Sequence, residues 1–70
     1  MDRQEGRYLL EFRCRGEVDW SKGSGFRNLK DAKQWVDDTL KNVQRVIEGR
    51  IFDWQQMAYR YYRTAFPFKP

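Results

Sequence analysis

The chain has 70 residues, with 14 lysines and arginines against 10 aspartates and glutamates, which gives a net charge of +4. This length predicts one small domain over residues 1–70, with short flexible tails at 1–6 and 67–70. A single cysteine, Cys14, and no histidine exclude an intrachain disulfide and the nitrogen and sulfur ligands of a zinc site. The polar start and the absence of any run near ~20 apolar residues favour a cytoplasmic protein with no membrane segment, bound metal or cofactor.

A β-hairpin over about residues 7–20 is the first predicted element. Every second residue over 8–14 is apolar, which is the period of a strand with one buried face. The Arg-Gly pair that follows can form a turn, and apolar and acidic residues alternate over 17–20, which predicts a short return strand. The next segment, 21–25, is rich in serine and glycine and is predicted to be a flexible loop.

The second predicted element is an amphipathic helix over about residues 29–41. Its apolar residues recur at spacings of three and four, and its opposite face is charged. Asn28 is a suitable N-cap, with Asp31 three residues later. We expect Trp35, in the middle of the apolar face, to anchor the core and the charged face to be solvated.

The segment after this helix has two interpretations. Val46, Ile47 and Ile51 continue the apolar stripe of the helix, in which case Gly49 is its C-cap. The β-branched residues over 43–48 instead favour a third strand beside the hairpin. A two-stranded hairpin is marginal in water, so we favour the strand.

A second helix is predicted over about residues 54–65, because Asp53 can cap it with Gln56 at its third position and apolar residues recur at helical spacing. Alternation over 59–63 supports a competing strand interpretation. Pro67 pushes the residue before it out of helical geometry, so the helix should end there. The predicted class is α+β, with a hairpin, a central helix, a third strand and an aromatic helix. The first part of this order resembles the architecture of many short bacterial and phage proteins, a likeness that carries no function.

Aromatic residues gather in the C-terminal segment, close to arginines. The chain has three tryptophans, four tyrosines and five phenylalanines, and seven of these aromatic residues fall within residues 52–70. One buried stripe cannot use all of these rings, and exposed tyrosine beside arginine is enriched at protein interfaces. The same composition can stack on bases and bind phosphates. A third interpretation is that the rings fill a small core and the arginine stems cover them.

Catalysis is not expected from this sequence. Histidine, the commonest acid–base group near neutral pH, is absent, and Cys14 lies on the predicted buried side of a strand without a local base. The acidic pairs Glu17/Asp19 and Asp37/Asp38 have no apolar pocket in prospect that would shift their pKa values. We therefore expect a protein that is not an enzyme.

Two functions remain open. The first is a small binding module, such as an inhibitor, adaptor or accessory subunit, which docks an acidic patch of a larger protein or associates with itself. Its predicted contact residues are Tyr59, Arg60, Tyr62, Arg63, Phe66 and Phe68. The second is a nucleic-acid or nucleotide-phosphate binding protein that uses the same tyrosines for stacking. Its predicted phosphate contacts are Lys22, Arg50, Arg60, Arg63 and Lys69.

Overall fold

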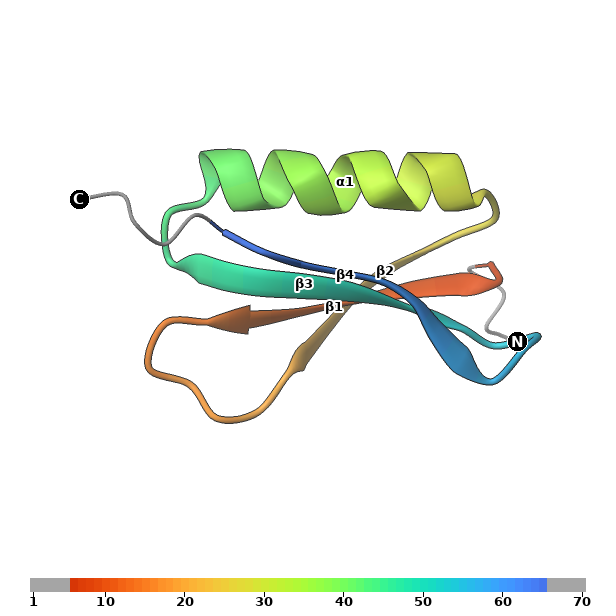
Figure 1. Ribbon diagram of the computed structural model, residues 1–70, viewed down its shortest axis with the longest axis horizontal. Helices are drawn as coiled ribbons and strands as arrows, with labels where there is room; N and C mark the ends of the chain where they lie inside the picture. Colours follow the sequence, from red (N-terminus) through yellow and green to blue (C-terminus); the bar gives the residue numbers. More distant parts are fainter. Residues whose placement is uncertain (1–5, 66–70) are drawn as a thin grey trace.

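Within residues 6–65, which the computed structural model describes, four antiparallel strands form one sheet and one helix packs on a face of that sheet (Figure 1). The elements in chain order are β1 Tyr8–Cys14, β2 Ser21–Phe26, α1 Leu29–Asn42, β3 Val46–Asp53 and β4 Ala58–Thr64. The strand order is β2-β1-β3-β4, so β1 and β3 are central. The predicted α+β class is confirmed. The predicted tails at 1–6 and 67–70 lie outside the described residues, except for Gly6.

The central helix is confirmed, with α1 ending one residue beyond the predicted range of 29–41. Asn28 caps it as expected, because its side-chain oxygen accepts hydrogen bonds from the backbone N–H groups of Lys30 at 3.0 Å and Asp31 at 3.4 Å. The amphipathic pattern and the cap are local signals, and both agree with the packing of the helix on the sheet.

The third strand is present but lies later than predicted. The prediction placed it at 43–48, whereas β3 begins at Val46 and continues to Asp53. The N–H of Val43 still donates to the carbonyl of Thr39 in the last turn of the helix. Residues 43–45, of which Val43 is the one β-branched residue, therefore end the helix and form the connection to the strand.

The return strand predicted at 17–20 is wrong, because this stretch belongs to the loop between β1 and β2. The segment predicted to be a flexible loop forms β2 and pairs with β1. Packing explains Gly23 of β2, because a Cβ atom at this position would lie 3.3 Å from the Phe12 ring. The glycine leaves space for a neighbouring side chain, a requirement that the local sequence does not reveal.

The C-terminal helix predicted at 54–65 is also wrong, since this stretch forms a turn followed by β4. Asp53 accepts hydrogen bonds from the backbone N–H groups of Gln55 at 2.9 Å and Gln56 at 3.3 Å, as in a helix cap, but here it closes a hairpin turn. Met57 ends the turn with a φ of 52°. Pairing of β4 with β3 then satisfies the backbone groups that β3 would otherwise leave open.

The hydrophobic core lies between α1 and the central strands. Its buried apolar side chains are Tyr8, Leu10, Ala32, Val36, Val46 and Ile51. The helix lies close to the sheet at Gly49, where a Cβ atom would lie 3.0 Å from Cγ1 of Val36. Trp35 is not the predicted core anchor: it is 47% exposed and packs edge-on against Phe26. Because α1 lies so close to the sheet at Gly49, the contact has room for alanine and valine side chains but not for a tryptophan ring.

Candidate binding surface

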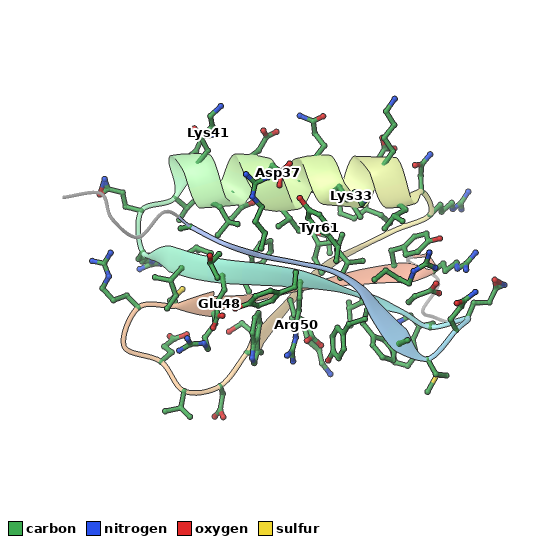
Figure 2. The ribbon with its side chains drawn as sticks, in the orientation of Figure 1. Lys33, Asp37, Lys41, Glu48, Arg50 and Tyr61 are labelled. Atoms are coloured by element: carbon green, nitrogen blue, oxygen red, sulfur yellow. The ribbon has the colours of Figure 1, made fainter. Side chains whose placement is uncertain are left out.

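The face of the sheet opposite α1 is left uncovered by every helix and strand of residues 6–65. Figure 2 shows Glu48 and Arg50 on this side of the sheet, whereas Tyr61 lies between the sheet and the helix. Side chains alternate across a strand, so every second residue of β3 shares this side, as do the residues of β1 that pair with them. In β4 a register shift against β3 places Tyr59 and Tyr62 on it together. We call it the helix-free face. Its principal side chains are Glu11, Arg13, Trp20, Glu48, Arg50, Phe52, Trp54, Tyr59 and Tyr62.

An arginine between two aromatic rings marks the middle of the helix-free face. The Arg50 guanidinium lies 3.8 Å from the ring centroid of Trp20 and 4.3 Å from that of Tyr59. Tyr62 meets Trp20 edge-on, with the ring centroids 6.5 Å apart. Cation–π and edge-to-face contacts of this kind hold the rings in defined positions.

The ring contacts continue toward the β3–β4 turn. Phe52 lies 5.0 Å from Tyr59 and 5.2 Å from Trp54, both measured between ring centroids. Trp54 is 50% exposed, Tyr59 48% and Tyr62 57%. We call these five residues, Trp20, Phe52, Trp54, Tyr59 and Tyr62, the aromatic row. Large rings that are packed together and yet half open to solvent are typical of an interaction surface.

Beneath the aromatic row, Glu11 is buried and has two partners. Arg50 Nε donates to Glu11 Oε1 at 2.7 Å, and the Tyr59 hydroxyl donates to the same oxygen at 3.2 Å. Burial, followed by the charge of Glu11, raises the pKa of Tyr59. These contacts fix the position of the Tyr59 ring on the face.

Glu48 repeats this arrangement one strand over. The Tyr62 hydroxyl donates to Glu48 Oε1 at 2.5 Å, and Arg13 Nε donates to the other carboxylate oxygen. The hydrogen bond from Tyr62, followed by the Arg13 contacts, lowers the pKa of Glu48, and the same bond raises the pKa of Tyr62. Glu48 with Arg13 and Glu11 with Arg50 form two ion pairs, so the four charges cancel across the face.

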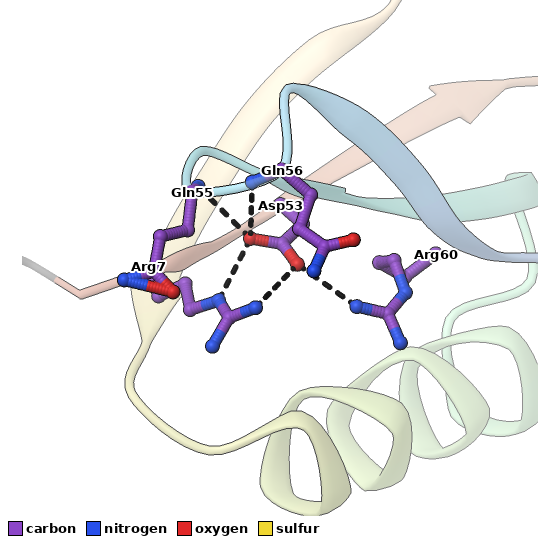
Figure 3. A network of polar contacts seen from close by, with 5 residues as sticks. All are labelled: Arg7, Asp53, Gln55, Gln56 and Arg60. Carbon is purple, nitrogen blue, oxygen red and sulfur yellow. Dashed lines mark hydrogen bonds and ion pairs between the residues drawn. The ribbon is translucent and has the colours of Figure 1, made fainter.

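Arg60, predicted to lie in the docking surface, is instead part of a cluster around the buried Asp53 carboxylate (Figure 3). Arg7 donates twice to this carboxylate, at 2.8 and 3.0 Å, and Arg60 Nη1 donates at 3.0 Å. The backbone N–H groups of Gln55 and Gln56 complete the set. The Arg7 contact and these further bonds hold the pKa of Asp53 well below its usual range. The cluster fixes the β3–β4 turn at the end of the sheet.

Arg63 also lies on the helix side of the sheet. Its Nη1 donates to Asp37 of α1 at 3.0 Å, and the Tyr61 hydroxyl donates to the same carboxylate oxygen at 2.8 Å. The Lys33 ammonium lies 5.3 Å from the centroid of the Tyr61 ring. The register shift between β3 and β4, which makes Arg60 an extra residue of β4, places Arg60 and Arg63 on the side opposite Tyr59 and Tyr62.

The structure brings together part of the predicted contact set and adds residues to it. Tyr59 and Tyr62 share the helix-free face, and Arg50, predicted as a phosphate contact, lies there in an ion pair. Lys22 is exposed and lies opposite Glu11 in the register of β1 and β2. Phe66, Phe68 and Lys69, which were also predicted as contacts, lie outside the described residues.

Sequence reasoning missed Trp20, Phe52 and Trp54 as members of the surface. The alternation over 59–63 indicated a strand, but by itself it places Tyr59 on one face with Tyr61 and not with Tyr62. The register shift between β3 and β4 at Ile51 and Phe52 is what brings Tyr59 and Tyr62 to the same face. Alternation in β3 likewise places Arg50 and Phe52 on one face. Pairing of β3 with β4 puts these two residues beside Tyr62 and Tyr59.

The described residues contain no cluster of three or more His, Cys, Asp or Glu side chains that could hold a metal ion. None of their helices is long and apolar enough to cross a membrane. Comparison with protein-family models, with curated proteins and with solved structures gave no match. The fold and the surface define a small α+β domain with one aromatic sheet face open to solvent.

Proposed function

We propose that the protein is a small non-catalytic binding module that docks a protein partner through the helix-free face. The observation that carries this proposal is the aromatic row, in which Trp54, Tyr59 and Tyr62 are each about half exposed while their neighbours hold them in place. Tyrosine and tryptophan dominate the binding energy of many interfaces, because each ring gives a large contact area at a small entropy cost.

Preorganisation of the two tyrosines supports docking further. Their hydroxyls are already bonded to Glu11 and Glu48, so the rings need little additional ordering when a partner arrives. An interface that is ordered before binding loses less side-chain entropy on association. An inhibitor, adaptor or accessory subunit would use a rigid surface of this kind.

The charges of the face favour a protein over a nucleic acid. Arg13 and Arg50 are paired with Glu48 and Glu11, so phosphate groups would meet two carboxylates as well as two guanidiniums. Nucleic-acid affinity depends on cations that neutralise phosphates, whereas aromatic stacking alone is weak. Arg60 and Arg63, the basis for expecting an acidic partner, bond to Asp53 and Asp37 on the other side of the sheet. The partner surface is therefore expected to be apolar and close to neutral.

The proposal is tested with two matched substitutions. Trp54 and Trp35 are 50% and 47% exposed on opposite sides of the sheet, so Trp54→Lys and Trp35→Lys make the same chemical change at similar exposure. Immobilised wild-type protein and both variants are compared for the proteins they retain from a lysate of the source cells. A protein retained by wild type and Trp35→Lys but lost with Trp54→Lys supports docking through the helix-free face.

Two results contradict the proposal. One is that every captured protein is retained equally by Trp54→Lys and wild type. The other is tight binding of short single-stranded oligonucleotides at about 150 mM salt, with a linear log–log salt slope, which would establish the nucleic-acid function instead.

A further inference from the structure

We propose that the partner on the helix-free face is a second copy of this chain, bound face to face about a twofold axis. This inference rests on the proposed function and names the occupant of the same surface. Twofold dimers are the commonest oligomers, and their interface uses the same patch of both subunits. A patch that pairs with itself must not be strongly repelled by its own charge, and it must bury enough area to hold a dimer together.

Charge on the helix-free face meets the first condition. The whole chain carries +4, so two copies repel one another on average. On this face, however, Arg13 and Arg50 are balanced by Glu48 and Glu11. Lys22, opposite Glu11 in the register of β1 and β2, adds one positive charge to each face, so two such faces repel each other less than two whole chains do. Each arginine can also approach a carboxylate of the other copy.

Area meets the second condition at its lower limit. Four strands about 4.8 Å apart, with about 3.3 Å per residue over seven residues, give a face of roughly 400 Å² in projection. Accessible side-chain surface exceeds a projection, so two faces bury on the order of 1,000 Å², where specific interfaces begin. A dimer in the micromolar range is expected rather than a permanent one.

The two ends of the face complement each other. The β1–β2 loop at residues 15–20 and the β3–β4 turn at 54–57 lie at opposite ends of the sheet, and both bend away from α1 (Figure 1). Val18 in the loop is 86% exposed, and Met57 in the turn is 66% exposed. In a face-to-face pair with antiparallel β1 strands, the twofold axis brings the loop of one copy against the turn of the other. Each apolar tip is then covered by its counterpart.

The first experiment measures mass against concentration by sedimentation equilibrium from about 5 to 500 μM, after circular dichroism has shown that each variant is folded. We expect wild type and Trp35→Lys to pass from monomer to dimer and Trp54→Lys to dimerise about ten-fold more weakly or worse, because the twofold axis places two new cations in one interface. Tyr62→Lys, on the same face in β4, should behave as Trp54→Lys does. Self-pairing is overturned if wild type remains monomeric throughout, or if both face variants dimerise as wild type does.

The second experiment tests the orientation in a Cys14→Ser background. Chains with Val18→Cys are mixed with chains carrying Met57→Cys and treated with a short bifunctional maleimide. We expect the mixed product to form several times faster than either unmixed one, and Trp54→Lys to remove this excess. Equal rates in all three samples would refute the antiparallel pairing.

Failure of self-pairing and failure of the docking function give different results. A wild-type monomer together with a captured protein that Trp54→Lys loses overturns the second copy alone. If wild type is a monomer and no captured protein depends on Trp54, both self-pairing and the docking function are overturned.

Discussion

Substitution of Gly49 by alanine tests how closely α1 lies on the sheet. A Cβ atom at this position would lie 3.0 Å from Cγ1 of Val36 and 3.2 Å from two atoms of the Phe12 ring. Val36 is fully buried and cannot move outward without shifting the helix. Overpacking of this kind costs about 1–3 kcal/mol, of which about 0.5–1 kcal/mol is recovered because alanine restricts the unfolded chain more than glycine does. We therefore expect a net loss of about 1–2 kcal/mol, which lowers the melting temperature by roughly 5–15 °C.

The assay is a double-mutant cycle measured by urea and thermal unfolding. Val36→Ala alone removes buried methyl groups and should cost about 2 kcal/mol. With Gly49→Ala added, the new methyl group occupies the vacated space, so the double variant should lose about 1 kcal/mol less than the sum of the single losses. Val18→Ala, in the exposed loop, is the control and should be additive with Gly49→Ala. An unchanged or higher melting temperature for Gly49→Ala, or an additive cycle with Val36→Ala, would refute the close approach.

Four further predictions concern single side chains. Because the folded-state pKa of Asp53 is depressed, its contribution is present at neutral pH and lost as the pH falls below about 5, so Asp53→Asn should flatten the acid limb of a melting-temperature profile. Tyr62→Phe removes a hydroxyl donor and should raise the pKa of Glu48 toward its usual value, as NMR titration would show; an unchanged pKa would contradict the bond. Met57→Gly relieves a left-handed backbone and should stabilise by about 0.5–1 kcal/mol in urea unfolding, with any loss counting against the turn geometry. Trp35→Ala should leave a cooperative melt, since the ring is half exposed; complete unfolding would mean that it is core.

Local signals were enough for two elements of the fold. β1 follows from its period of two, and α1 follows from its apolar stripe and the Asn28 cap. β2 could not be predicted, because Gly23 is required by the position of the Phe12 ring on the neighbouring strand and not by a local pattern. The turn after Asp53 could not be distinguished from a helix start either, since the same carboxylate accepts the same backbone N–H groups in both structures.

The candidate surface was predictable in composition but not in arrangement. The abundance of rings near the C-terminus indicated an aromatic surface, and Tyr59 and Tyr62 belong to it. The face on which each residue lies depends on the register of its strand. The predicted helix in place of β4 put Arg60 and Arg63 beside Tyr59 and Tyr62, whereas in the sheet the arginines lie on the opposite side. Trp20 reaches the row from outside the strands, through its contact with Arg50, and no periodic pattern indicates this contact.

Side-chain oxidation by hydroxyl radicals, followed by mass spectrometry, tests the role of the helix-free face most directly. The protein is footprinted alone at low concentration and again in the bound state, whether the partner is a second copy or a captured protein. We predict that oxidation of Trp54 and Met57 slows several-fold on binding, whereas Trp35, with nearly the same exposure on the helix side, reacts at an unchanged rate. Protection of Trp35 with no change at Trp54 would contradict the account and place the interface on the helix.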